Sequence, residues 1–427
     1  MGRLAAPLIV ANATVPLLGI VDTAVVGQLD SPTHLGGVAV GSLLFGYVFW
    51  SFGFLRGGTS GPMAQALGAR DGDEMRAVLA RAGLIVAVAG VGLIAILLPL
   101  LASLLRLAGA STGVEGHAVD YAGIRLLSAP ATLAGYALLG ALTGLQRPRG
   151  ALALMLATNG TNIVLDLWFV LDLGWGVRGV AAASVIAEYI GAAVGLVALR
   201  RALTGVSGAW RRRQILDRGA LRRMAGLNRD ILLRNLALIS AFSLFTVFGA
   251  RLDDVTLAAN AVLMNFHTLA GYVLDGFADA AEALVGQAVG RRARDQFRAT
   301  VRAAALWVGG FAVVLVTLLL VLGGVFIDIM TVLPEVRAAA RDYMPYVAIA
   351  PLIGAWAFLL DGVFMGATRG PEMRNAMMLA LIAFIAAASA LVPWLGNHGL
   401  WSAYVLFMIA RVALLGRYLP RLARGVG

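Results

Sequence analysis

Long apolar blocks alternate with short polar segments along the whole chain. The blocks predict twelve helices, over 4–27, 35–62, 78–105, 117–145, 150–172, 177–200, 229–251, 256–288, 297–326, 336–366, 373–393 and 398–419. Each block has the roughly 20 residues that an α-helix needs to cross a hydrocarbon layer of about 30 Å. The strict apolar and polar alternation of membrane β-strands does not appear in the sequence. The pattern therefore predicts an all-α polytopic membrane protein.

The composition agrees with this class and removes several kinds of chemistry. Of the 427 residues, 60% are hydrophobic and 13% are charged, whereas soluble domains have about 25% charged residues. There is no cysteine, and all 34 basic residues are arginine. The lack of cysteine excludes thiolate catalysis and Cys-ligated zinc, and the lack of lysine excludes a Walker A loop. We therefore expect no cofactor apart from a coupling ion.

The formal net charge of +11 has a topological explanation. Arginines gather in alternate loops, at Arg70 and Arg76, Arg147 and Arg149, Arg200 to Arg223, Arg291 to Arg294, and Arg369 and Arg374. Loops that are rich in arginine remain on the cytoplasmic side of a membrane. Both termini are therefore predicted to be cytoplasmic, and nucleic-acid binding is rejected as the reason for the positive charge.

The two halves of the chain repeat each other at an offset of 222 residues. Matching pairs include Gln65 and Gln287, Tyr121 and Tyr343, Gly140 and Gly362, Gly144 and Gly366, and Arg147 and Arg369. Six predicted spans fill each repeat, so both halves begin on the same side of the membrane. We predict two six-helix lobes, 1–200 and 229–427, joined by a cytoplasmic linker at 201–228. Transporters place substrate between such repeats, near the midplane.

Polar residues that only one half carries are the first candidates for function. Asp22 lies deep in the first predicted span, and the offset pairs it with Leu244. A carboxylate at the bilayer centre costs about 3 kcal/mol, so it is a functional candidate by default. Asn159, Asn162 and Asp166 have the spacing i, i+3, i+7 and share one helix face.

Two carboxylates and two amides form an oxygen-rich set that suits a proton or a sodium ion. Carboxylates held close together favour retention of a proton by one of them. Sodium binding is expected at Asp22, Asn162 and Asp166, and Ser184 on the sixth span offers another oxygen. The alternative is that these groups only hydrogen-bond neighbouring helices.

A second polar set lies in the second half. Asp275, Asp279 and Glu282 have the spacing i, i+4, i+7 in the eighth predicted span, and Asp361 lies in the tenth. Arg234 or Arg56 offers a structural ion pair to these acids, and this interpretation is favoured slightly over transport. For His267 and Glu188, two other polar groups within spans, a packing role is favoured. Function and structure thus remain open alternatives for the second set.

An enzymatic alternative rests on one short motif. Gly58-Thr-Ser-Gly61 is similar to the serine motif of intramembrane proteases, with Ser60 as nucleophile and His267 as the only midspan base. No second feature supports this interpretation.

Pro7 lies about four turns from Asp22 in the first span, where a bend could tie cation occupancy to cavity shape.

The motifs together resemble the MATE (multidrug and toxic compound extrusion) transporters, in particular the DinF-like branch. The resemblance rests on Gly19-Ile-Val-Asp-Thr-Ala-Val-Val-Gly-Gln-Leu29, on Asn162 with Asp166, on Leu274-Asp-Gly-Phe-Ala-Asp279 and on Leu360-Asp-Gly-Val-Phe-Met-Gly-Ala-Thr-Arg369. It implies a V-shaped pair of lobes that exports amphipathic, mostly cationic compounds in exchange for H⁺ or Na⁺. We expect the protein in the inner membrane, and we expect a monomer because both lobes lie in one chain.

The resemblance also implies residue roles. The coupling acid of the first span corresponds to Asp22, and the helix-bending proline corresponds to Pro7. Asn162, Asp166, Ser184 and Tyr121 correspond to the family's cation site, although a threonine is common where this chain has Ser184. Other branches use acids of the second lobe, which leaves Asp275, Asp279, Glu282 and Asp361 as alternatives. A lipid-linked precursor flippase of the same superfamily is the second functional hypothesis.

Overall fold

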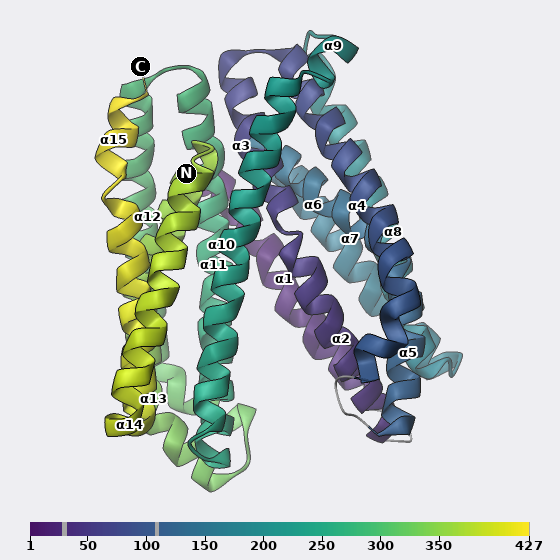
Figure 1. The fold of residues 1–427 in the computed structure, drawn as a ribbon, viewed down its shortest axis with the longest axis vertical. Helices are drawn as coiled ribbons and strands as arrows, with labels where there is room; N and C mark the ends of the chain where they lie inside the picture. The colour runs from purple at the N-terminus through teal and green to yellow at the C-terminus, as the bar shows by residue number, and fades with distance from the viewer. Residues whose placement is uncertain (28–31, 107–110, 427) are drawn as a thin grey trace. The chain divides into compact units, whose positions relative to one another are not determined.

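The computed structural model describes residues 1–27, 32–106 and 111–426, and the regular structure in these ranges is entirely helical (Figure 1). The first half contains α1 (Gly2–Val26), α2 (Pro32–Ser51), α3 (Phe54–Ala69), α4 (Gly72–Arg106), α5 (Thr112–Leu126), α6 (Ala129–Gly144), α7 (Pro148–Asp166), the π-helix η1 (Leu167–Asp172), α8 (Gly176–Leu203) and α9 (Arg212–Ile215). The second half contains α10 (Arg218–Ala250), α11 (Asp254–Gly290), α12 (Arg294–Met330), α13 (Pro334–Gly366), α14 (Gly370–Gly416) and α15 (Leu419–Arg424).

The chain divides into two compact units. The N-terminal unit is Val10–Met224, and the C-terminal unit is Ala225–Gly427 together with Met1–Ile9. The first junction falls inside α1 and the second inside α10. Both connections between the units are therefore continuous helices.

The apolar helices of the described residues are long enough to span a membrane. Nine pass on length and hydropathy, and a tenth span results if the bent pair α5 and α6 is counted as one. The predicted number of twelve differs from this for two reasons. α14 covers two predicted spans, which meet at Gly396, where φ is 54°. α1, 25 residues long, includes residues whose side chains are outside the described set and is not in the count.

Two predicted spans are broken inside the N-terminal unit. The span at 117–145 is a pair of helices, α5 and α6, bent by 53°. Pro130 lies in the first turn of α6, where its missing N–H costs no helical hydrogen bond. The span at 35–62 is interrupted between α2 and α3 at Phe52 and Gly53. The first of these spans bends at its break, whereas the second is only locally interrupted.

The repeat that the sequence predicts is present in the helix packing. A Cβ on Gly140 would lie within 3.0 Å of the backbone oxygen of Arg56, and a Cβ on Gly362 would meet the oxygen of Ala278 equally closely. Both members of the second pair lie 222 residues after those of the first. The two halves therefore use glycine for the same close approach, α3 to α6 in one unit and α11 to α13 in the other.

The turns between helices repeat in the same register. Four non-glycine residues of the described ranges have positive φ, and they form two pairs at the 222-residue offset: Arg70 (55°) with Arg292 (54°), and Gln146 (56°) with Thr368 (55°). A non-glycine residue seldom adopts this left-handed conformation. Its recurrence at equivalent turns shows that the repeat extends to backbone detail.

The segment between the two halves is largely ordered. α8 continues to Leu203, and α10 begins at Arg218, eleven residues before the predicted span at 229–251. Asp217 precedes α10, and its Oδ1 accepts a hydrogen bond from the N–H of Ala220 at 2.7 Å, which caps the helix start. The segment 204–217, which contains the one-turn helix α9, is thus the whole connection between α8 and α10.

Candidate functional site

α7 places three polar side chains in the interior of the N-terminal unit. Asn159, Asn162 and Asp166 are 7%, 2% and 0% exposed, respectively. α7 packs closely on α8, because a Cβ on Gly191 of α8 would overlap the side chain of Thr158. Glycine at this contact brings the α7 side chains within reach of polar groups on α8.

Asp166, Asn162 and Ser184 form one hydrogen-bonded cluster. In the amide orientation that satisfies both of its ends, Asn162 donates to Asp166 Oδ2 at 3.2 Å. Its amide oxygen accepts from both Oγ and the backbone N–H of Ser184, each at 3.2 Å. The neutral amide thus orients the carboxylate, and the hydroxyl orients the amide. The structure brings these three predicted site residues together.

The helix changes its winding directly after Asp166. Leu167–Asp172 is a π-helix, and Gly174 and Gly176 follow with φ of 65° and 54°. Single π-helical turns inside α-helices are frequent at functional sites, because they leave backbone groups outside the regular hydrogen-bond pattern. The local geometry therefore marks the end of α7 independently of its side chains.

α7 also contacts α1 through Asn159. Its Nδ2 donates to Thr14 Oγ1 at 2.6 Å, and Thr14 donates to the backbone oxygen of Ala11 at 2.7 Å. Asp22 lies on the same helix, but its side chain is outside the described residues. Pro7 lies in the part of α1 that belongs to the C-terminal unit, and α1 continues through it. The predicted sodium site is thus described only at Asn162 and Asp166.

Tyr121 has a different hydrogen-bond partner. It is 5% exposed on α5 and its hydroxyl accepts from Ser42 Oγ of α2 at 3.1 Å. A Cβ on Gly41 would lie 2.6 Å from the Tyr121 ring, so α2 and α5 meet closely at this point. These contacts fix Tyr121 in the helix packing rather than within the Asp166 cluster.

Glu188 of α8 is paired with an arginine that the sequence analysis did not select. Arg125 of α5 lies 3.4 Å from Glu188 Oε1, donates to the Ser128 hydroxyl and lies over the Phe49 ring at 5.4 Å. This ion pair agrees with the packing role predicted for Glu188. A search for basic as well as acidic residues within apolar blocks would have found Arg125.

The C-terminal unit holds an ion cluster of opposite character. Asp361 Oδ2 on α13 accepts from Arg234 of α10 and from Arg411 of α14, the latter at 2.9 Å. The side chains of Asp361 and Arg411 are 14% and 5% exposed. Arg411 also lies over the Phe407 ring at 5.7 Å. The predicted pairing of Arg234 with an acid of the second set is present, and Arg411 is a second partner that was missed.

The three acids of α11 are in the same unit as Asp361. Asp279 and Glu282 are each 5% exposed, whereas Asp275 is half-buried. All three have a polar or electrostatic partner in the fold. Gly276, next to Asp275, lies against α1, because a Cβ there would be 2.7 Å from the backbone nitrogen of Ile9. The first residues of α1 therefore cover the part of α11 that carries Asp275.

His267 of α11 is satisfied by a buried neighbour. Its Nε2 lies 2.6 Å from the hydroxyl of Tyr404, and the two rings meet edge to face at 5.3 Å. This contact supports the packing role that the sequence favours. Within the residues that the structure describes, no group of three or more His, Asp or Glu side chains is placed to hold a metal ion.

Long apolar helices, an internal repeat and polar clusters within the spans are the features of a multi-pass membrane transporter. The chain belongs to the MatE family, whose model matches residues 7–168 and 231–392, once in each half. The protein is accordingly a MATE-family transporter and not an enzyme. The protease hypothesis based on Ser60 and His267 is therefore set aside.

Two relatives cover most of the chain. DNA damage-inducible protein F of Escherichia coli is 43% identical over 416 residues, which are 96% of this chain and 89% of that protein. Protein DETOXIFICATION 44, chloroplastic, of Arabidopsis thaliana is 28% identical over 430 residues, which are 96% of this chain and 80% of that protein.

Solved structures share the fold at low sequence identity. An outward-facing multidrug resistance MATE transporter of the MOP superfamily matches with a TM-score of 0.91 and 19% identity, over 99% of this chain and 95% of that chain. A MOP superfamily transporter from Pyrococcus furiosus, described as having a binding pocket of reverse polarity, matches with a TM-score of 0.88 and 20% identity, over 98% and 94% of the chains.

Proposed function

We propose that this protein is a cation-coupled multidrug antiporter of the inner membrane, with both termini cytoplasmic. It exports amphipathic, mostly cationic compounds in exchange for H⁺ or Na⁺ and works as a monomer. The observation that carries the proposal is the buried cluster of Asp166, Asn162 and Ser184. The 222-residue offset pairs Asn162 with Phe384, Asp166 with Ala388 and Ser184 with Leu406, so the C-terminal half lacks the cluster.

The cluster is suited to reversible cation binding. The Asn162 amide donates to the Asp166 carboxylate and is itself held by Ser184, so neutral groups orient the carboxylate. In this proposal a proton or Na⁺ binds at the Asp166 carboxylate, and Asp22 of α1 provides the second carboxylate. The Asn159–Thr14 hydrogen bond joins α7 to α1, so occupancy of the site alters the forces on α1.

Transport follows from that connection. In the outward-facing state, the cation binds at Asp22 and Asp166, α1 shifts near Pro7, and the substrate cavity contracts and releases the drug. In the inward-facing state, the cation leaves to the cytoplasm and a new substrate binds. Cation and drug therefore bind preferentially to different conformations, which is the requirement for antiport.

Dye efflux from proteoliposomes tests the proposal. A fluorescent cationic dye is loaded, a pH or sodium gradient is imposed, and wild type is compared with Asp22→Asn, Asp166→Asn and Asp172→Asn. Asp172 is an exposed carboxylate at the end of η1, so its variant is the matched control. Gradient-driven efflux should be lost in the first two variants and kept in the third, and the effective gradient identifies the ion. Full activity of both Asp22→Asn and Asp166→Asn would move the cation site to Asp275, Asp279 or Asp361.

A lipid-linked precursor flippase is the second candidate. It is favoured by one observation, the two arginines around Asp361, of which Arg411 is buried and Arg234 is partly buried, because guanidinium groups bind pyrophosphate well. If wild type transports no dye under any gradient but translocates a fluorescent lipid-linked pyrophosphate, the flippase function is correct and the antiporter proposal fails.

A further inference from the structure

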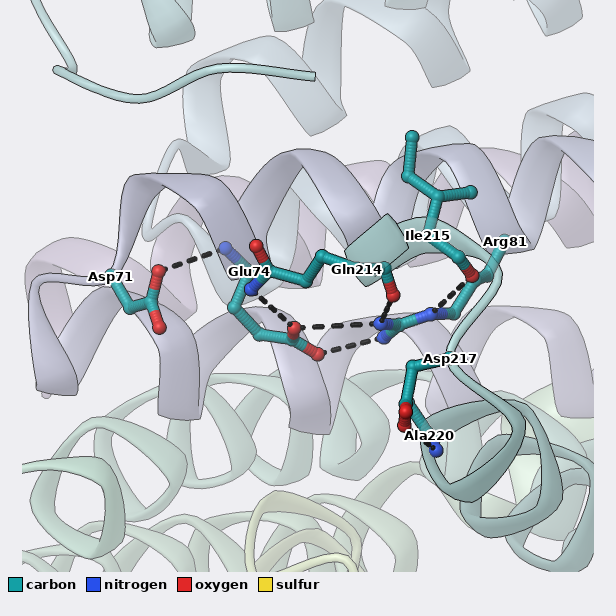
Figure 2. A network of polar contacts seen from close by, with 7 residues as sticks. All are labelled: Asp71, Glu74, Arg81, Gln214, Ile215, Asp217 and Ala220. Atoms are coloured by element: carbon teal, nitrogen blue, oxygen red, sulfur yellow. Dashed lines mark hydrogen bonds and ion pairs between the residues drawn. The ribbon is translucent and has the colours of Figure 1, made fainter. Parts of the chain in front are cut away.

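The segment that joins α8 to α10 is held against α4 by a buried arginine (Figure 2). Arg81 of α4 is 3% exposed. Its Nε donates to the backbone oxygen of Ile215 at 3.1 Å, and its Nη2 donates to that of Gln214 at 2.6 Å. Its Nη1 pairs with Glu74 at 2.7 Å, and Glu74 also accepts from Gln214 Nε2 at 3.1 Å. Side chain and backbone of the segment are thus fixed to one helix.

Further contacts fix the start of the segment. Arg76 donates to the backbone oxygen of Val206 at 2.8 Å, and Asp73 accepts from the N–H of Ala209 at 2.7 Å. Asp73 also pairs with Arg211 at 2.8 Å. The 222-residue offset pairs Arg81 with Ala303, so the second half has no counterpart of this arginine. The contacts give residues 206–217 a defined position on the N-terminal unit.

That position is at the boundary of the apolar part of α4. Arg81 is the last charged residue before the apolar run 82–105, and the next charge is Arg106. A membrane-spanning helix enters the hydrocarbon where its charged residues end. Gln214 and Ile215, which bond directly to Arg81, therefore lie at the level of the lipid headgroups. Figure 1 shows α9 as a short turn at the end of its unit.

The docked segment exposes a surface that is basic and partly apolar. Trp210 is 59% exposed and Leu216 is 46% exposed. The exposed arginines of this surface are Arg212, Arg213, Arg218, Arg222 and Arg223. None of these five pairs with an acid among the described parts of the chain. We call Trp210, Leu216 and these arginines the linker surface.

We infer that the linker surface binds the headgroups of anionic phospholipids in the leaflet that it faces. Guanidinium groups match phosphate with paired hydrogen bonds, and basic clusters beside membrane helices are attracted to anionic lipid. Trp210 and Leu216 are the kinds of side chain that enter the interfacial region. Because Arg81 holds the segment at headgroup level, little ordering is needed upon binding. The inference does not depend on which solute or cation the protein transports.

A single labelled cysteine tests the inference, since the chain has none of its own. Leu216→Cys carries a spin label, and its accessibility to oxygen and to a water-soluble nickel chelate is measured in vesicles of phosphatidylglycerol and of phosphatidylcholine. The label should be more accessible to oxygen and less accessible to nickel in phosphatidylglycerol, and high salt should reduce the difference. Equal accessibility in the two lipids would overturn the inference.

Removing arginines distinguishes lipid binding by the linker surface from the general attraction of a basic protein to anionic lipid. Arg212→Gln with Arg213→Gln should weaken retention of phosphatidylglycerol, measured by native mass spectrometry, by roughly fivefold for each arginine removed. The control removes two exposed arginines of α15, Arg421→Gln with Arg424→Gln, and should change retention little. If both pairs have the same effect, or if the surface recruits an acidic protein while showing no preference among lipids, anionic lipid is not its specific partner.

Discussion

The two units place a carboxylate in the same kind of apolar surrounding but give it different neighbours. Asp166 in the N-terminal unit is held by a neutral amide, whereas Asp361 in the C-terminal unit lies between two arginines. The two guanidinium groups compensate the charge of Asp361, whereas the Asn162 amide orients the Asp166 carboxylate and carries no charge itself. The backbone of the two halves repeats, so the difference is chemical. It favours the N-terminal unit as the place of coupling and the C-terminal unit as the scaffold.

The largest expected effect comes from removing the negative charge of the C-terminal cluster. Asp361→Asn leaves the buried Arg411 and the partly buried Arg234 without their carboxylate, and breaking one side of a buried ion cluster costs about 3–5 kcal/mol. The melting temperature of the purified protein in detergent should fall strongly. Asp166→Asn, whose new side-chain oxygen can still accept from the Asn162 amide, should lower the melting temperature much less. If Asp361→Asn is stable and loses coupling, whereas Asp166→Asn is unstable, the roles assigned to the two units are reversed.

The next largest expected effect, overpacking at the repeated glycine contact, should be equal in the two units. Gly140→Ala and Gly362→Ala each place a Cβ against the backbone of the neighbouring helix, and overpacking costs typically about 1–3 kcal/mol. Both variants should therefore lower the melting temperature by a similar amount.

The control for these variants is Gly135→Ala, also on α6, where a Cβ meets nothing within 4 Å. It should leave the protein as stable as wild type. A large loss in only one of Gly140→Ala and Gly362→Ala would show that the repeated contact does not have the same energetic importance in both units.

The repeated backbone was the most predictable part of the fold. Identities at one offset persist because the same close helix contacts and the same turns recur, as Gly140 and Gly362 show. Pro130 likewise lies at a break, in the first turn of α6, where proline is favoured because its missing N–H costs no helical hydrogen bond. Gly396 did not, because one glycine among 52 carries little information about its φ. The π-helix after Asp166 has no sequence signal that we recognise.

The candidate site was predictable where one helix carries it. Asn159, Asn162 and Asp166 share a face by spacing alone, and their burial agrees with that prediction. Partners on other helices were harder to predict. Arg411 contacts Asp361 across 50 residues, and an arginine within a span was given less weight than an acid. Both are costly in lipid, so equal weighting would have selected Arg411.

A smaller effect is expected where the hydroxyl of the N-terminal cluster is removed. Ser184→Ala leaves the Asn162 oxygen with only the backbone N–H of residue 184, and one lost hydrogen bond costs about 1 kcal/mol. The cation concentration for half-maximal dye efflux should rise about fivefold. Ser184→Thr keeps a hydroxyl and should remain near wild type. Identical values for the alanine and threonine variants would mean that the hydroxyl does not act on the cation site.

The smallest expected effect lies outside the membrane, at the start of α11 in the C-terminal unit. Asp253 caps this helix and accepts from the hydroxyl and the N–H of Thr256, at 2.6 and 2.8 Å. The side-chain hydrogen bond and then the backbone one hold the pKa of Asp253 below its ordinary value of 3.8. Asp253→Ala should cost about 0.5 kcal/mol near neutral pH, the low end for a cap.

The pH dependence of that cap has a defined sign. Because the pKa of Asp253 is lowered in the folded state, the ionised cap stabilises the fold above the ordinary pKa and loses this contribution as pH falls through the lowered one. The melting difference between wild type and Asp253→Asn, which retains a capping oxygen but no charge, should be constant at neutral pH and should shrink in acid. A difference that grew in acid would contradict the assignment. The contribution of Asp253 to stability should depend on pH in the same way with and without a sodium gradient. Dye efflux that depends on Asp166 should instead differ between the two conditions.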